Sequence, residues 1–168
     1  SNTPLTAPLF SNVTFLGPRE NSATPNSLYR RAMHLRRNSR TSVYNSVFTG
    51  YPTGLHVDGS ASQGAATSND LQLENLVFAN MGVNFEQTSG ANTWSGITSY
   101  FTDPTRSNET YASTSALGLP SGYNSLTNPT LLPASGSILL SGASFSNSRL
   151  STDPFWTPTT YRSPIRAR

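Results

Sequence analysis

The chain has 168 residues, of which 35% are apolar and 11% are charged, with a net charge of +3 and no cysteine. This length is enough for one domain with a core. The absence of cysteine excludes a disulfide framework and cysteine-based metal sites, and the low charge is not typical of disordered chains. Every basic residue is arginine, and arginines this sparse argue against nucleic-acid binding. No apolar run approaches the roughly 20 residues of a membrane helix.

Serine, threonine and asparagine together supply 62 residues, and the apolar residues occur in short bursts between turn formers. Helical bundles and coiled coils are instead rich in Ala, Leu, Glu and Lys. The composition therefore predicts an all-β fold with many loops. The chain begins at Ser1 without an initiator methionine or signal peptide, so we expect a mature fragment or a piece of a longer protein.

The chain opens with a proline-broken lead-in over residues 1–8 and a strand-like run that Pro18 ends. Residues 28–60 then contain short apolar runs separated by strong turn signals, GYPTG at 50–54 and Asp58-Gly59. Three short strands with sharp corners are expected of one turn of a solenoid. Strands are expected at 9–17, 32–35, 42–49, 55–57, 71–81 and 137–145.

The rest of the chain has weaker strand signals. Residues 60–69 are small and polar and predict a loop. Residues 83–136 predict an elaborated loop excursion that lies over the coils and is anchored by its aromatic side chains. We therefore expect a single domain over residues 1–168, or the C-terminal fragment of one. Its coils would lie at about 9–81 and 137–150, with a tail at 151–168.

A short pattern, Asn-x-x-Phe-x-Gly/Asn, recurs along the chain. The copies are NVTFLG (12–17), NSVFTG (45–50), NLVFAN (75–80) and GASFSN (142–147). Recurrence at a near-constant period indicates a stacked repeat, here a parallel β-helix, with an antiparallel β-sandwich as the alternative. The inward phenylalanines would stack from coil to coil, and asparagine at a corner tolerates a left-handed backbone. The repeat residues are Asn12, Phe15, Asn45, Phe48, Asn75, Phe78 and Phe145.

The segments FSNVTFLGP, RRAMHLRRNSRTSVYNSVFTGYPTGLHVDGS, NPTLLPASGSILLSGASF and DPFWTPTTYR resemble the C-terminal half of a family of Bacteroidetes surface proteins. These proteins are hypothetical or described as lipoproteins, and they resemble right-handed parallel β-helices of the pectate-lyase type. The ending YRSPIRAR departs from that family, in which the tail continues YRGAFG. The resemblance implies the fold and a location on the extracellular face of the outer membrane or secretion, but no activity.

The residues allow two enzymatic interpretations, a polysaccharide lyase and a glycosidase. A polysaccharide lyase would use Arg36, Arg37 or Arg40 as base, with Asp58 among the acidic ligands of Ca²⁺, but calcium needs six to eight oxygens and acids are sparse. A glycosidase would pair Asp58 with Glu74. Aspartate in a DG turn, however, is ordinarily explained by turn geometry.

The two histidines, His34 and His56, each lie in an apolar run. Histidines on neighbouring strands can bind a metal, but no third ligand is evident, so a structural role is favoured and neither a metal site nor a cofactor is predicted.

The arginines offer a binding reading. Arg30, Arg31, Arg36, Arg37 and Arg40 suit bidentate pairing with acidic sugars or an acidic partner protein, although a solvated face with some pairing to Glu20, Asp58 or Glu74 is the simpler explanation. Alternation along a strand predicts that Arg36 and Arg37 point opposite ways, with one of them buried or paired. Trp94 and Tyr100 could stack on sugars, but anchoring of the long loop is the preferred explanation.

We therefore predict a structural or binding domain of an exported cell-surface protein that recognises a polysaccharide or a partner protein. It would pack on an upstream segment or another subunit, because solenoid ends need capping. A carbohydrate-active enzyme whose catalytic coils lie upstream and an accessory subunit of an outer-membrane assembly are the alternatives.

Overall fold

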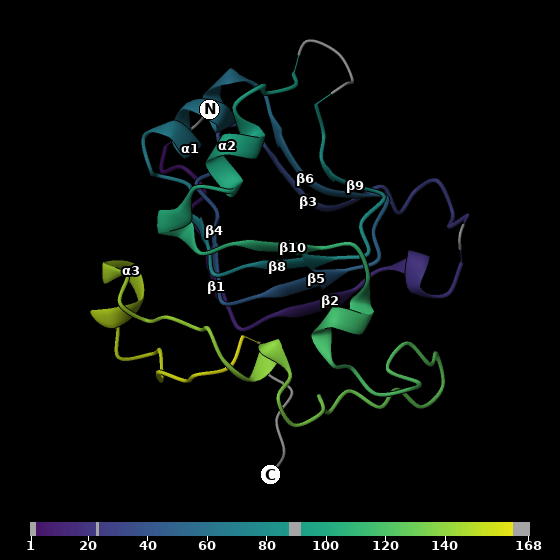
Figure 1. Ribbon diagram of the computed structural model, residues 1–168. Helices are drawn as coiled ribbons and strands as arrows, with labels where there is room; N and C mark the ends of the chain where they lie inside the picture. The colour runs from purple at the N-terminus through teal and green to yellow at the C-terminus, as the bar shows by residue number, and fades with distance from the viewer. Residues whose placement is uncertain (1–2, 23, 88–91, 163–168) are drawn as a thin grey trace.

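The chain winds repeatedly through three parallel β-sheets (Figure 1). The computed structural model describes residues 3–22, 24–87 and 92–162. The first sheet holds β1 (Leu9–Ser11), β4 (Ser42–Tyr44) and β7 (Leu73–Glu74). The second holds β2 (Thr14–Leu16), β5 (Val47–Thr49), β8 (Val77–Ala79) and β10 (Glu109–Tyr111), and the third holds β3 (Arg31–Arg36), β6 (Thr53–Asp58) and β9 (Val83–Phe85). Every ladder between these strands is parallel, so the fold is a β-helix and the antiparallel sandwich is wrong.

Three copies of the sequence pattern stack in register on the second sheet. Phe15 pairs with Phe48, and Phe48 pairs with Phe78. The first two rings stack with centroids 5.1 Å apart, and the next pair meets edge to face at 5.7 Å. Phe48 and Phe78 are almost fully buried, and they form the centre of the core together with inward residues of the other two sheets.

Left-handed backbone conformations at the corners explain the asparagines of the pattern. Asn12, Asn45 and Asn75 have φ angles of 56°, 50° and 56°. Asparagine adopts this region more readily than most residues other than glycine. At the other end of the motif, Gly50 and Asn80 have φ angles of 67° and 52°.

The prediction that GASFSN (142–147) forms a fourth copy of the repeat is wrong. Phe145 lies in an irregular segment outside the sheets. In place of the strand expected at 137–145, the chain has a short 3₁₀ turn, η4 (Ile138–Leu140), followed by irregular backbone with an isolated bridge at Gly142. The fourth strand of the second sheet is β10, which places Thr110 opposite Phe78. The ring that packs on Phe78 at this end is Phe101 of α2 (Ile97–Phe101), with centroids 4.7 Å apart. The helix thus replaces the missing phenylalanine.

The long excursion carries more regular structure than expected. Residues 83–136 contain β9, α2, β10 and two 3₁₀ turns, η2 (Pro104–Arg106) and η3 (Thr114–Leu117). Its aromatic residues do anchor it, because Tyr100 and Phe101 are buried and Trp94 packs against the same core. Residues 60–69 hold the helix α1 (Ser60–Thr67) in place of a loop, since Ala65 and Ala66 gain burial against the core.

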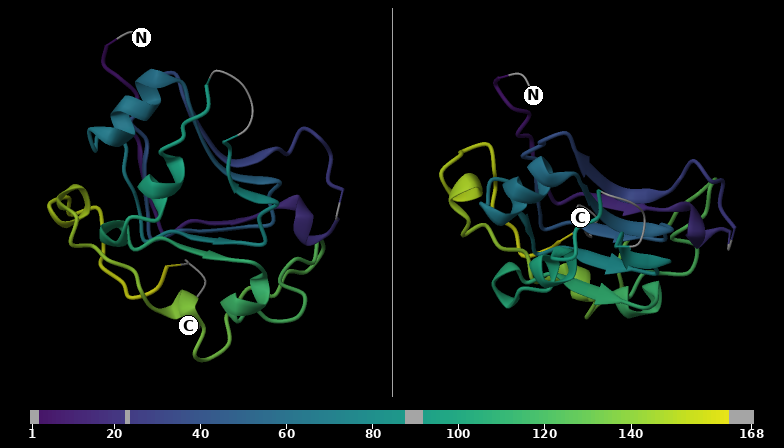
Figure 2. Two further views of the ribbon diagram at one scale, coloured as in Figure 1. Left: turned by 45° about the horizontal axis from the view of Figure 1, so that its top comes forward. Right: turned by 90° about the horizontal axis from the view of Figure 1, so that it is seen from above.

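The C-terminal segment, residues 137–162, covers the outside of two of the three sheets (Figure 2). Leu139 and Leu117 bury the outward residues Val47 and Val77 of the second sheet. From α3 (Ser148–Ser151), Arg149 donates to the hydroxyl oxygen of Ser42 on the first sheet at 2.8 Å. The remaining 3₁₀ turn is η1 (Pro18–Glu20). The outer face of the third sheet, by contrast, presents the exposed side chains His34 and Arg36.

Candidate functional site

The candidate site lies on the outer face of the β3–β6–β9 sheet. Alternation along β3 turns Met33 and Leu35 into the core and leaves His34 and Arg36 exposed. On β6 the same alternation buries Leu55 and Val57 in the core and places His56 and Asp58 on the opposite face. Chemically active residues therefore accumulate on one face of two adjacent strands.

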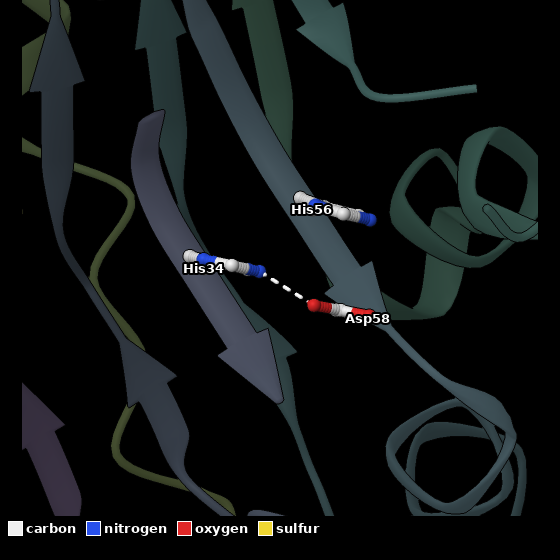
Figure 3. Close-up of side chains that lie close together, drawn as sticks. All are labelled: His34, His56 and Asp58. Atoms are coloured by element: carbon white, nitrogen blue, oxygen red, sulfur yellow. Dashed lines mark hydrogen bonds and ion pairs between the residues drawn. The ribbon is translucent and has the colours of Figure 1, made fainter. Parts of the chain in front are cut away.

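Strand register brings His34, His56 and Asp58 together (Figure 3). His34 pairs with His56 across the ladder, and their rings stack with centroids 4.9 Å apart and 4° between the planes. The Nε2 atom of His34 lies 2.9 Å from Oδ2 of Asp58, and the imidazole donates because an ionised carboxylate only accepts. The Nε atom of Arg36 lies 3.5 Å from the same oxygen.

His56 is a buried imidazole on the outer face of the third sheet. It is 5% exposed, and neither ring nitrogen has a partner among the described residues. Arg31 and Glu86, which form an ion pair at 3.0 Å, act on it electrostatically. Burial lowers the pKa of His56 below its ordinary value of 6.5, and the charge of Arg31 lowers it further. His56 is therefore neutral at physiological pH, with a free lone pair.

Asp58 is the acidic centre of the group. The hydrogen bond from His34 holds the pKa of Asp58 below its ordinary value of 3.8, and the charge of Arg36 adds to this effect against the opposing effect of burial. Because its side chain is only 11% exposed, the carboxylate is held in place between its partners.

Arg36 and Arg37 line the same surface hollows. One hollow of about 240 Å³ also contains Asp58, Gly59 and Asn92, and a second of about 780 Å³ extends toward residues 4–6. The strand alternation that predicted opposite orientations for the two arginines does not extend to Arg37, because β3 ends at Arg36 and Arg37 has a left-handed φ of 60°. The expected pairing of one of them is confirmed by the contact between Arg36 and Asp58.

Three of the expected binding residues lie away from this group or are unavailable to a ligand. Arg40 pairs with Asp70 at 3.2 Å. Tyr100 is 8% exposed, donates from its hydroxyl to the Leu71 carbonyl oxygen at 2.8 Å, and lies under the guanidinium of Arg106. Burial raises the pKa of Tyr100 to about 12. Because Trp94 packs on Tyr100 and on the core, the two rings form no open platform for a sugar.

Asp58 and Glu74, the two carboxylates that a glycosidase would pair, lie on strands of different sheets. Glu74 lies on β7 of the first sheet, where Asn147 donates to it at 3.0 Å. Asp70 is engaged by Arg40. Asp58, Asp70 and Glu74 therefore have separate partners.

The sequence did not predict that Asp58 lies beside both histidines. It also gave no signal for Glu86, which pairs with Arg31 next to His56. The spacing His56-x-Asp58 within a strand signals that both side chains share a face. The pairing of His34 with His56 depends on the register of β3 against β6, which the spacing of 22 residues did not reveal.

Comparison with known proteins identifies one family. A family model described as a pectate-lyase-like β-helix domain matches residues 1–120, which include every strand of the three sheets. No curated protein and no solved structure gives a significant match. Within the described residues, no helix has the length and apolar character needed to cross a membrane.

Proposed function

Because the chain belongs to the family of pectate-lyase-like β-helix domains, we propose that it binds an acidic polysaccharide through the outer face of the third sheet. The proposal includes export of the protein, either to the extracellular face of the outer membrane or into the medium. It also includes a right-handed solenoid as the form of the β-helix. A surface rich in hydroxyl and amide groups and poor in charge is consistent with that location.

The observation that carries the proposal is the pair Arg36 and Arg37 beside one hollow. Arg37 takes part in none of the ion pairs formed within the described residues, so its guanidinium is available to a ligand. Guanidinium groups bind carboxylates in a planar, bidentate geometry, which suits the uronate groups of an acidic glycan. The exposed His34 adds a further polar group to the same face.

Calorimetric titration with a uronic-acid polymer and with a neutral glucan tests this function. We expect the wild type to bind only the uronate polymer, with an affinity that falls as salt is added. The double variant Arg36→Ala/Arg37→Ala should bind at least about tenfold more weakly, because each charge-assisted hydrogen bond is worth about 1.5–3 kcal/mol. Arg40→Ala is the matched control, since Arg40 pairs with Asp70 away from the hollow, and it should bind as the wild type does.

Failure of the wild type to bind the uronate polymer would overturn the proposal, as would equal binding by the double variant. The same samples distinguish binding from catalysis. A lyase would release unsaturated uronides, detected by their ultraviolet absorbance, and a hydrolase would release reducing ends.

A second function, as a subunit of a surface assembly, is favoured by the apolar end of the β-helix. β1, β2 and β3 are the terminal strands of their sheets at that end, so each leaves one backbone edge without a strand partner in the described chain. An apolar hollow of about 220 Å³ opens there, and the rings of Phe10 and Phe15 beside it are 47% and 44% exposed. Another β-helical turn, supplied by a second subunit, would cover these groups.

Sedimentation velocity tests the assembly function. We expect self-association of the wild type that weakens in the variant Phe10→Ser/Phe15→Ser. A monomer at every concentration would contradict association with a second copy of the chain.

A further inference from the structure

We propose that His34, His56 and Asp58 form a binding site for a divalent transition-metal ion, with Zn²⁺ as the best-matched ion. The three residues each offer one ligand atom, and all three atoms lie within 4.8 Å of one another. They extend from adjacent strands of one sheet, whose backbone hydrogen bonds keep their Cα positions in register (Figure 3). The site is thus built on rigid elements of the fold.

The distances are close to those of an assembled site. With metal–ligand bonds of about 2.0–2.2 Å, the ligand atoms of a tetrahedral zinc site lie about 3.3–3.6 Å apart. Nε2 of His34 and Oδ2 of Asp58 are already 2.9 Å apart. All three ligand atoms lie within 4.8 Å of one another, so rotation of the side chains would bring them to the distances of a zinc site.

The environment of His56 is the independent observation that points to a ligand. An imidazole that is 5% exposed has two ring nitrogens without hydrogen-bond partners among the described residues. Leaving such a buried polar atom unsatisfied is unfavourable, and a metal ion bound to one nitrogen would remove part of that penalty. Figure 3 shows the ring of His56 beside that of His34, with the carboxylate of Asp58 close to both.

The chemistry of the donors selects the class of metal. Two imidazoles and one carboxylate suit Zn²⁺ and neighbouring transition metals, which accept nitrogen ligands. Calcium, which takes six to eight oxygen ligands, is not matched by this set. When the ion binds, His34 carries its proton on Nδ1, and its Nε2 lone pair turns from Asp58 to the metal. Three protein ligands leave the fourth position to water or another exogenous ligand.

Calorimetric titration of the 168-residue chain with Zn²⁺, after the chain has been stripped of metal with EDTA, tests the site. The chain contains two histidines, both in the proposed site, and no cysteine, so background binding by these residue types is absent. We expect saturable binding of one Zn²⁺ per chain. Co²⁺ should give the visible absorption of a low-coordinate nitrogen and oxygen site.

The variants His34→Asn and Asp58→Asn should each weaken Zn²⁺ binding by at least about tenfold, a loss that removal of even a supporting hydrogen bond can produce. His34 is exposed, so His34→Asn retains the core and keeps the test valid if Asp58→Asn or His56→Gln folds poorly. Asp70→Asn, which removes a carboxylate outside the group, should bind Zn²⁺ as the wild type does. No saturable binding by the wild type, or unchanged affinity in His34→Asn, would overturn the proposal.

The assay contains no polysaccharide, so its outcome is independent of the proposed glycan binding. Arg36→Ala/Arg37→Ala separates the two sites further. It should lose glycan affinity while it retains one Zn²⁺ per chain, and loss of the metal from this variant would contradict the assigned ligand set.

Discussion

The imidazoles of His34 and His56 stack in parallel on neighbouring strands, one exposed to solvent and the other buried. Asp58 binds the exposed ring and thereby joins two turns of the β-helix. The polar side chains on the outer face of the third sheet are therefore connected to one another rather than isolated in solvent.

Substitution of Asp58 by asparagine should destabilise the chain by about 1–2 kcal/mol, because the charged hydrogen bond from His34 and the contact with Arg36 are lost. Urea denaturation in the presence of EDTA measures the change without any contribution from metal. Asp70→Asn is the control. Its ion pair with Arg40 is about 40% exposed on both sides, and such surface pairs contribute about 0–1 kcal/mol. Equal losses in the two variants would contradict this role of Asp58.

The phenylalanine file predicts unequal effects along its length. Phe48→Ala should reduce the free energy of unfolding by about 3–5 kcal/mol, because this ring is 2% exposed and lies between two others. Phe15→Ala should cost only about 1 kcal/mol, since its ring is 44% exposed at the end of the file. Chemical denaturation of both variants checks the order, and a larger loss at Phe15 would show that this end is covered in solution.

Variants of the corner asparagines Asn45 and Asn75 distinguish the contribution of the left-handed backbone from that of side-chain hydrogen bonds. Asn45 donates to the Ser144 carbonyl oxygen at 3.0 Å and accepts from the Ser144 amide at 2.8 Å, whereas no side-chain hydrogen bond of Asn75 is found in the described structure. Glycine retains the left-handed φ at both positions. We therefore expect Asn45→Gly to cost about 1–3 kcal/mol and Asn75→Gly less than about 1 kcal/mol, measured by thermal and urea denaturation. Similar losses would mean that Asn45 does not hold the C-terminal segment.

The contact between Glu109 and Arg162 predicts a pH dependence. Burial pushes the pKa of Glu109 upward, but hydrogen bonds from Tyr111 and Arg162 outweigh it and hold the pKa below the ordinary 4.5. The folded chain therefore binds this proton less readily than the unfolded chain. The stabilisation is present above pH 4.5 and is lost as the pH falls through the folded-state value.

Unfolding of the wild type and of Glu109→Gln at several pH values from about 6 to 3 measures this contribution. The wild type should be the more stable protein at the upper end of the range, and the difference should shrink toward the lower end. Parallel stability curves would contradict the assigned ion pair. Because Arg162 is 6% exposed, the variant should also loosen the C-terminal segment, measured as faster amide exchange over residues 137–162.

The repeat on the second sheet was predictable because its cause is local. An inward phenylalanine, an asparagine that adopts a left-handed corner and a glycine or asparagine at the next corner recur in three copies, and the structure places all three in register. The fourth copy failed because GASFSN matches the pattern only in part. The true fourth strand carries Thr110 at the phenylalanine position, and Phe101 from α2 supplies the ring.

The sequence was thus sufficient to predict the β-helix and the pairing of one of the two arginines Arg36 and Arg37, since alternation and corner preferences act over a few residues. Assembly of the candidate site was decided only by tertiary structure. The contact of His34 with His56 and Asp58 requires one register between β3 and β6, which the packing of two complete turns determines. The packing of Trp94 and Tyr100 against the core, which buries Tyr100 and partly buries Trp94, has the same origin. Burying large aromatic rings against the core stabilises the fold more than exposing them to solvent does.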